Sequence, residues 1–542
     1  MEHAVRKARG AYYTDGAVAD FLVRWAIRSP TDRVLDPCFG DGIFLESSLT
    51  HLSRLGSPGG DGVTGVELHT ESYEMVRARL GSARPRLLQG DFFSFSKKDL
   101  GRFQAVVGNP PFIRYQKFSG DQRTRALAKA TAAGVHLSAL TSSWAPFIAH
   151  STTFIAPGGR LAMVAPAEIC HAAYPRPLLR HLKDLFRRIL ILAFEKRLFP
   201  ELNEDTVLLL ADELGARGGD LRIATLRDMD ALGDSTHDPS GYGADAERVQ
   251  EERPSLTTYF LPHTIRTLYD QLTLSQMVIR LGSVANVGIG YVTGDNRFFH
   301  LSAAESRQLR IPPRAQRPAV CRSAWLKGVV FSRSDWRVLD LGQRKTRLLS
   351  LTGRETELPR GVKAYLQRGE GGGVHRAYKC RTRNPWYVVP GVQVPDLFLS
   401  YMAHERPVLA LNRAGVVCPN TLLAVKALPL WRHIVRAVPA VWCNSLTFLS
   451  AEIEGHSLGG GMLKVEPKEA ARLVIPSPEL VSPADRSALI RRVDHLCRKR
   501  SSTEARNLLD GELLQRGMGL SQHDCQLLCE GLKILQSRRR NR

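Results

Sequence analysis

Seven short apolar runs rich in β-branched residues follow one another between residues 33 and 212, and stretches with helical spacing separate them. Such alternation is typical of a parallel sheet whose crossover helices cover both faces. Residues 43–52 and 72–80 have the apolar spacing of two of these helices. The sequence therefore predicts an α/β domain with a seven-stranded sheet. The predicted strands are RVLD (33–36), VTGVE (63–67), RLLQGD (86–91), FQAVVGN (103–109), GRLAMVAP (159–166), RILILAF (188–194) and TVLLLAD (206–212).

The pattern changes twice after the last of these strands. Residues 214–255 are rich in Gly, Asp, Ser and Arg, which predicts a linker or an exposed excursion. Irregular strands and turns then continue to about Pro476, and helical spacing returns after the capping residue Ser482. A chain of 542 residues is also too long for one ordinary core. We predict a catalytic domain over 1–245, a mixed α+β domain over 256–480, and a helical segment over 481–542.

Charge indicates the kind of partner. The chain has 75 Lys and Arg against 53 Asp and Glu, a net charge of +22. Such a surplus favours a polyanion, although charge alone does not separate DNA from RNA or from an anionic membrane. No apolar run approaches the roughly 20 residues that cross a bilayer, and the first residues lack the apolar core of a signal peptide. We expect a cytoplasmic protein with no membrane partner.

The nine cysteines are scattered along the chain, and none has the CxxC or Cys/His spacing of a zinc site. We expect buried reduced thiols and no metal.

The run DPCFGDG (36–42) follows the first predicted strand and opens a helix. Its glycines allow the backbone to pass close to a ligand at the carboxyl edge of the sheet, where nucleotide-like cofactors bind. An ordinary turn between a strand and a helix is the simpler interpretation. A dinucleotide fold is less favoured, because its GxGxxG motif needs a glycine where Leu45 stands.

Acidic residues end the next two predicted strands. Glu67 is placed to accept hydrogen bonds from both hydroxyls of a ribose, and Asp91 is placed to accept from an adenine amine, with Phe92 beside the ring. Taken alone, Glu67 is better explained as a solvated side chain after a strand, and Asp91 alone is a weak signal. Their order at successive strand ends favours a nucleoside site.

The fourth predicted strand ends in Gly108 and the run NPPF (109–112). Its two prolines fix the backbone and remove donors, so the loop presents the Asn109 side chain and carbonyl acceptors such as that of Pro110. Hydrogen bonds from an exocyclic amine to these acceptors favour a pyramidal nitrogen whose lone pair faces an incoming methyl group. Phe112 offers a ring on which a flipped base can stack. A proline-rich turn with a core Phe is the alternative.

These motifs resemble the amino-methyltransferases of the class I Rossmann-like fold, whose signature is (D/N)PP(F/Y/W). Their order is similar to that of the gamma class of DNA adenine-N6 methyltransferases, in which a target-recognition domain follows the catalytic domain. The resemblance implies a site-specific enzyme that transfers a methyl group from S-adenosyl-L-methionine to N6 of an adenine flipped out of double-stranded DNA.

The resemblance also implies roles for single residues. GAYYTDG (10–16) is similar to the opening motif, with Thr14 at the methionine end of the cofactor and Asp15 where the family usually has Pro. Phe147 corresponds to a Phe beside the cofactor adenine, and Phe199 of LFPELNEDTVLLL (198–210) to a second ring against the flipped base. An ordinary core position is the alternative for Phe199. The implied cofactor-binding residues are Thr14, Asp36, Pro37, Gly40, Gly42, Glu67, Asp91, Phe92 and Phe147.

The second half of the chain is similar to the family's recognition domain in GIGYVTGDNRFFHL (288–301) and in residues 456–476. The run VHRAYKCRTRNPWYVVP (374–390) mixes cations with aromatic residues, which suits contacts with phosphates and base edges. A solvated basic segment with core aromatics is the alternative. The candidate DNA-binding residues are Arg376, Lys379, Arg381 and Arg383.

Other functions use a similar acceptor-rich loop. A methyltransferase for cytosine N4, for RNA or for a protein amide is the alternative within enzymes, and a non-catalytic DNA-binding protein is the alternative outside them. The sequence has no recognisable nuclease motif. We therefore expect the modification enzyme of a restriction-modification system, acting as a monomer on DNA beside a separate cognate endonuclease.

Overall fold

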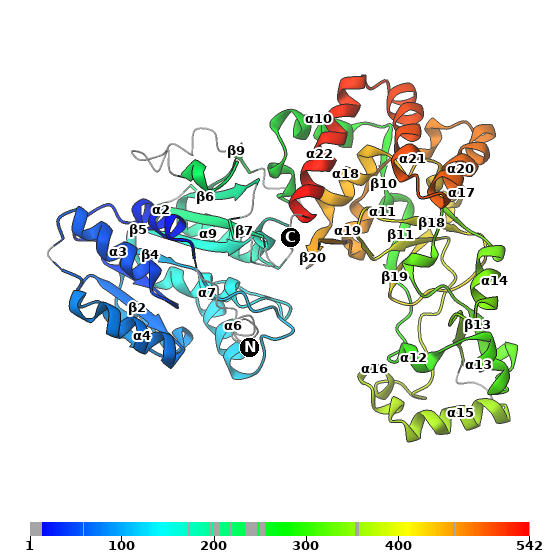
Figure 1. Cartoon of the computed structure of the whole chain (residues 1–542), viewed down its shortest axis with the longest axis horizontal. Coiled ribbons are helices and arrows are strands. Elements are labelled where there is room, and N and C mark those ends of the chain that lie inside the picture. Colours follow the sequence, from blue (N-terminus) through cyan, green and yellow to red (C-terminus); the bar gives the residue numbers. More distant parts are fainter. Residues whose placement is uncertain are drawn as a thin grey trace. The chain divides into compact units, whose positions relative to one another are not determined.

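The computed structural model describes residues 14–57, 59–171, 174–195, 198–199, 205–216, 218–232, 247–249, 255–352, 357–458 and 461–540. The chain divides into two compact units, one up to Phe260 and one over Leu261–Arg540 (Figure 1). Residues 10–13 of the predicted opening motif and 233–246 of the predicted linker lie outside the described residues.

One mixed sheet forms the centre of the first unit, with the strand order β3-β2-β1-β4-β5-β7-β6-β8-β9. Strands β1 to β5 run parallel to one another, and β7 is antiparallel to both β5 and β6. Strands β1 to β7 coincide with the seven predicted strands. The strands are β1 (Val34–Asp36), β2 (Val63–Glu67), β3 (Arg86–Gln89), β4 (Phe103–Gly108), β5 (Ile155–Pro166), β6 (Phe186–Phe194), β7 (Thr206–Leu214), β8 (Asp220–Leu226) and β9 (Glu247–Arg248).

Strand β8 corrects the prediction of a linker over 214–255. It pairs in parallel with β6 along its whole length. Leu221 and Ile223 are buried, whereas Asp220 and Arg222 at the alternate positions form an ion pair at 2.7 Å. The linker prediction was wrong here. The charged residues that alternate with the buried ones make the sequence of this outer strand as polar as that of a loop.

Helices connect the strands and surround the sheet. Helices α3 and α4 coincide with the predicted helices at 43–52 and 72–80. Asp15, which stands where the resembled family has Pro, caps α2 by accepting a hydrogen bond from the amide of Ala17 at 2.8 Å. The helices are α2 (Gly16–Ala26), α3 (Ile43–Arg54), α4 (Thr70–Leu80), α5 (Lys97–Leu100), α6 (Gly120–Ala132), α7 (Trp144–Ser151), α8 (Glu168–His171) and α9 (Arg176–Leu185).

The second unit contains four small sheets, as far as the structure describes it. A five-stranded sheet has the order β11-β19-β16-β18-β14, and the others are β12-β15-β13, β17-β21-β20 and β10-β22. The strands are β10 (Val278–Arg280), β11 (Ala285–Ile289), β12 (His300–Leu301), β13 (Gln316–Pro318), β14 (Val330–Phe331), β15 (Arg347–Leu349), β16 (Leu397–Ser400), β17 (Met402–Ala403), β18 (Leu409–Asn412), β19 (Leu422–Ala427), β20 (His456–Leu458), β21 (Met462–Lys464) and β22 (Val474–Pro476).

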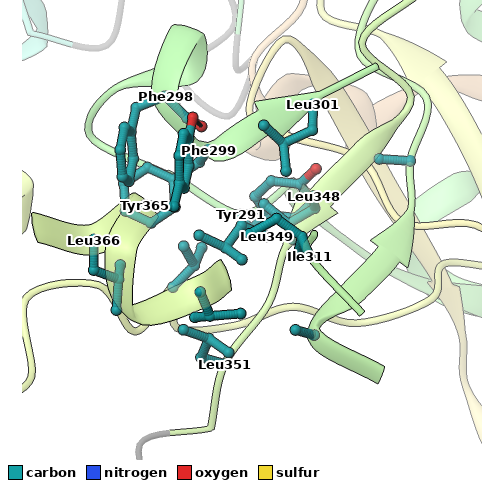
Figure 2. Packing of buried hydrophobic residues seen from close by; sticks show 14 of the residues in the cluster. Tyr291, Phe298, Phe299, Leu301, Ile311, Leu348, Leu349, Leu351, Tyr365 and Leu366 are labelled. Carbon is teal, nitrogen blue, oxygen red and sulfur yellow. Dashed lines mark hydrogen bonds between the residues drawn. The ribbon is translucent and has the colours of Figure 1, made fainter. Parts of the chain in front are cut away.

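An aromatic core fills the part of this unit around α12 and α15. Phe298 and Tyr365 stack face to face with ring centroids 4.4 Å apart, and Phe299 packs beside them (Figure 2). The helices of the unit are α10 (His263–Leu274), α11 (Leu281–Val284), α12 (Asn296–Phe299), α13 (Ala303–Gln308), α14 (Arg333–Leu341), α15 (Arg360–Gly371), α16 (Tyr378–Arg381), α17 (Arg432–Ala437), α18 (Ser445–Glu454), α19 (Pro467–Arg472), α20 (Pro483–Arg498), α21 (Ser502–Leu509) and α22 (Gln522–Arg540).

The C-terminal helices belong to this second unit and do not form the separate segment that we expected over 481–542. Helix α22 lies beside α18 (Figure 1). The buried carboxylate of Asp510 accepts hydrogen bonds from the amide and the hydroxyl of Ser445, at 2.8 and 2.6 Å. These contacts with the first turn of α18 tie the C-terminal helices to one core.

Among the described residues, no single helix is long and apolar enough to cross a membrane. One bent pair, Pro429–Ala440 with Ser445–Glu454 at 107°, meets the criteria of length and composition together.

A buried ion pair fixes the end of α22. The Arg539 guanidinium makes two hydrogen bonds to the Glu452 carboxylate, at 2.7 and 2.8 Å, and both side chains are at most 4% exposed. We expect Arg539→Met to lower the free energy of unfolding by about 3–5 kcal/mol, because it leaves a buried carboxylate without its partner. Urea titration followed by tryptophan fluorescence measures this loss. The double variant Glu452→Leu/Arg539→Met should recover most of it, and an equal loss in the double variant would contradict the explanation.

Candidate active site

A cavity of about 380 Å³ lies at the carboxyl edge of the first four strands. Segments that follow β1, β2, β3 and β4 all contribute to its wall. Eight of the predicted site residues line it: Thr14, Pro37, Gly40, Glu67, Asp91, Phe92, Asn109 and Phe147. Asp36, Gly42, Pro110, Phe112 and Phe199 are not among the lining residues. The parallel strands thus bring most of the predicted residues together.

The loop after β1 needs its glycines. Gly40 and Gly42 have φ angles of +52° and +86°, which other residues rarely adopt. A Cβ at Gly42 would also lie 3.0 Å from the side chain of Val76 in α4. The backbone is therefore fixed in a tight turn before α3, with the Gly40 amide donating to Glu67 Oε2 at 2.9 Å.

Asp36 is the buried carboxyl group of this loop. Its Oδ1 accepts from the amide of Cys38 at 3.1 Å, whereas its Oδ2 has no hydrogen-bond partner among the described residues. Burial raises the pKa of Asp36 well above the ordinary value, with the nearby carboxylate of Glu67 adding to the effect. A cationic ligand group would satisfy this carboxyl group.

Glu67 is held rigidly at the end of β2. It is only 6% exposed, its Oε2 accepts from Gly40, and its Oε1 accepts from the amide of His69 at 2.8 Å. A carboxylate has about four acceptor positions. The two backbone donors orient Glu67 and leave it able to accept from two hydroxyl groups of a ligand in the cavity.

Asp91 accepts two hydrogen bonds that the sequence did not predict. Its Oδ1 accepts from the Phe93 amide at 3.0 Å, and its Oδ2 pairs with the guanidinium of Arg125 in α6 at 2.7 Å. The sequence analysis did not identify Arg125, because no local motif connects α6 with the end of β3. Arg125 fixes the orientation of the carboxylate that faces the cavity.

Aromatic rings form the wall beside Asp91. The Phe92 and Phe147 centroids are 4.9 Å apart, and Phe93 meets Phe147 edge-on at 5.4 Å. His150 packs on Phe92 at 4.8 Å, and burial lowers the pKa of His150 to about 4. The imidazole is therefore neutral near pH 7 and packs as one more ring. This wall suits a flat heterocycle.

Asn109 connects the NPPF loop with the cofactor side of the cavity. Its amide nitrogen donates to Thr14 Oγ1 at 3.2 Å, and its backbone carbonyl accepts from the Cys38 thiol at 3.3 Å. The loop is thus bonded both to the segment before α2 and to the segment after β1.

Ser143 clamps the same loop from the other side, and the sequence analysis did not identify it. Its hydroxyl donates to the Pro111 carbonyl and accepts from the amide of Ile113 at 2.8 Å. Its own amide donates to the Ile113 carbonyl at 3.0 Å. These three bonds fix residues 111–113, and Ser143 itself lines the cavity. The sequence contains only a serine just before a helix, which is an ordinary capping position.

The two phenylalanines predicted to stack on a target base are buried. Phe112 is 6% exposed and Phe199 is 4% exposed. Residues 200–204, which follow Phe199 in its motif, lie outside the described residues. Stacking by either ring stays a prediction.

The predicted DNA-binding segment is partly structural. Arg383 donates to the carbonyls of Thr293 and Val292, at 2.8 and 2.5 Å, so its guanidinium holds a loop. Arg376, Lys379 and Arg381 are exposed. Two of the five guanidinium donors of Arg383 are thus occupied by the protein backbone, and contact of the four residues with DNA stays a prediction. No group of three or more metal-ligating side chains occurs among the described residues.

Comparisons with known proteins agree with this geometry. Residues 2–173 match the family model described as N-6 DNA Methylase. Residues 254–514 match the model described as Type II methyltransferase M.Eco57I, C-terminal domain. The first match covers most of the cavity, and the second covers most of the second unit.

Individual relatives are distant but extend over most of the chain. Type II methyltransferase M.AccI of Acinetobacter calcoaceticus is 19% identical over 86% of this chain and 85% of its own length. Type II methyltransferase M.XamI of Xanthomonas campestris pv. amaranthicola is 25% identical over 87% and 85%.

Among solved structures, the Type IIL restriction-modification enzyme MmeI in complex with DNA is similar to this chain in fold. It has a TM-score of 0.54 and 13% identity, over 93% of this chain and 70% of that chain. The two family matches decide between the functions considered above: the chain is an N6-adenine DNA methyltransferase similar to the type II enzymes, and its methyl donor is S-adenosyl-L-methionine.

Proposed function

We propose that the first unit carries out methyl transfer in the cavity at the strand ends and that the second unit recognises the DNA sequence. The enzyme would act as a monomer on double-stranded DNA, as the modification enzyme of a restriction-modification system with a separate endonuclease. The main support for the proposal is that Glu67, Asp91 and Asn109 line one cavity. A nucleoside cofactor and a target amine would meet there.

The residues of the cavity fit the cofactor. S-adenosyl-L-methionine supplies an activated methyl group when bound. Glu67 has two acceptor positions for the ribose hydroxyls, and the ring wall of Phe92 and Phe147 suits the adenine. Thr14, Pro37 and Gly40 line the cavity after β1 and would border the methionine end. The cofactor would thus lie along the ends of β1, β2 and β3.

The NPPF loop activates the target amine through hydrogen bonds. The Asn109 side-chain oxygen and the Pro110 carbonyl would accept the two protons of N6, which favours a pyramidal nitrogen with its lone pair toward the methyl group. A strong base is not needed for this step, because the nitrogen releases a proton to water only after it has accepted the methyl group and become positively charged. The loop must be rigid for these acceptors to be in place before the base arrives.

Glu67→Gln tests the ribose contact. The change removes a charge but keeps the size of the side chain. We expect cofactor affinity to fall about 10- to 150-fold, which corresponds to roughly 1.5–3 kcal/mol for hydrogen bonds to a charged group. Calorimetric titration with S-adenosyl-L-methionine measures it. Glu74→Gln, an exposed position on α4, is the matched control and should bind normally. Unchanged affinity in Glu67→Gln would remove Glu67 from the site.

Asn109→Ala tests the acceptor. We expect the turnover number on DNA to fall by roughly 10²–10³, the cost of losing one preorganised polar group, while cofactor affinity changes little. Asn109→Asp retains side-chain oxygens and should keep more activity than the alanine variant. Methylation by Asn109→Ala at the wild-type rate would show that the target amine is held elsewhere.

Ser143→Ala tests the clamp. Loss of the hydroxyl frees the Pro111 carbonyl and the Ile113 amide, so the loop should move and the turnover number should fall, by about 100-fold for a displacement near 1 Å. Cofactor affinity and thermal stability should change little. Ser143→Thr restores the hydroxyl and should recover activity, and Ser138→Ala, at an exposed position, is the control. Normal turnover in Ser143→Ala would show that the loop is rigid without the clamp.

A further inference from the structure

A second cavity, of about 650 Å³, lies within the second unit and is separate from the methyl-transfer site. Four segments form it: the residues before β16, the end of β18 with Arg413, strand β19 with helix α17, and the first turns of α20. Its side chains belong to none of the motifs in the sequence analysis. The basic residues that line it, called the basic cavity below, are Arg413, Lys426, His433, Arg436 and Arg486.

The balance of charge in the basic cavity is strongly positive. Asp396 is its single acidic lining residue. That carboxylate accepts from the Ala427 amide at 3.0 Å and lies 3.6 Å from Lys426 Nζ, so it offsets only one of the four full cations. Among the described residues, Arg413, Arg436 and Arg486 form no ion pair with a carboxylate. Three arginines therefore face the solvent without an anionic partner from the described chain.

The backbone that carries these arginines is rigid. Both the Arg413 and the Ala414 amides donate to the Phe331 carbonyl, at 2.9 and 3.1 Å. The side-chain amide of Asn412 donates to the Pro395 and Val416 carbonyls, each at 2.8 Å, which ties two walls of the cavity together. Arg486 donates to the Val481 carbonyl at 3.0 Å. The backbone of Arg413 and the side chain of Arg486 are thus held in place before any ligand binds.

We propose that the basic cavity binds phosphates of the DNA backbone and holds the duplex in register while the target base is out of the stack. The inference rests on the proposed function and names the surface that the second unit uses. Arginine is suited to this role, because its planar donors fit phosphate oxygens. Phosphate contacts supply position and affinity without reading sequence. The first turn of α20 adds a small positive potential at the wall of the cavity.

The test is the salt dependence of DNA binding by the full chain. A variant Arg413→Gln/Arg436→Gln/Arg486→Gln removes three cations from exposed or half-buried positions. The logarithm of the association constant decreases linearly with the logarithm of the salt concentration. The magnitude of this slope should decrease by about one for each lost phosphate contact, and hence by about three in the triple variant. Fluorescence anisotropy of a labelled duplex between 50 and 200 mM salt measures it. At saturating DNA and low salt, the turnover number should remain near that of the wild type.

The matched control is Arg314→Gln/Arg337→Gln/Arg491→Gln, which removes the same charge from exposed positions outside the basic cavity. A smaller change of slope in the control supports the basic cavity, and an equal change overturns it. An unchanged slope in the first variant also overturns it and would point to an acidic protein segment as the occupant. If the wild-type chain fails to methylate DNA, the proposed function fails, whatever the slope.

Discussion

The close approach of β1 and β4 at their carboxyl ends is the constraint on which the active site depends. Strand β1 lies between β2 and β4, so the loop that follows Asp36 and the loop that begins at Asn109 leave the sheet side by side. Gly108, with φ of +155°, makes this approach feasible, because a Cβ there would lie 3.0 Å from Asp36 Oδ1. The Cys38 thiol then bonds the two loops together. In the proposed site, the spacing between methyl donor and acceptor would thus be set by the sheet itself, and transfer requires such a fixed spacing.

The catalytic fold could be predicted largely because its strands are buried on both faces. Strands such as β2 and β4 appear in the sequence as nearly continuous apolar runs, which parallel sheets require. Strand β8 carries Asp220 and Arg222 between its buried residues, so its sequence resembles a polar loop. Its place is set by pairing with β6, a contact that no local pattern encodes. The same reason explains the C-terminal helices, whose sequence predicts helices but does not show that they pack on α18.

The residues of the active site also differ in how well the sequence predicts them. In a parallel sheet, residues at successive strand ends become neighbours, so the order of Glu67, Asp91 and Asn109 in the chain was enough to predict a shared cavity. Arg125 and Ser143 come from α6 and from the start of α7, and tertiary packing alone brings them to the strand ends. The roles of both are to orient another group. Residues that belong to a ligand-binding motif are therefore easier to predict from sequence than residues that hold the motif in place.

The second unit shows that basic residues clustered in sequence need not all be free to bind a ligand. Arg383 stands in a basic stretch of the chain, yet two of its donors bind backbone carbonyls. The cations of the basic cavity come from positions as far apart as Arg413 and Arg486, which no single sequence motif connects. Base flipping costs a few kcal/mol of unstacking and unpairing, so the duplex must be held while one nucleotide is out. Cations mounted on bonded backbone meet that demand better than cations on an exposed segment, because little of their binding energy is lost in ordering the chain.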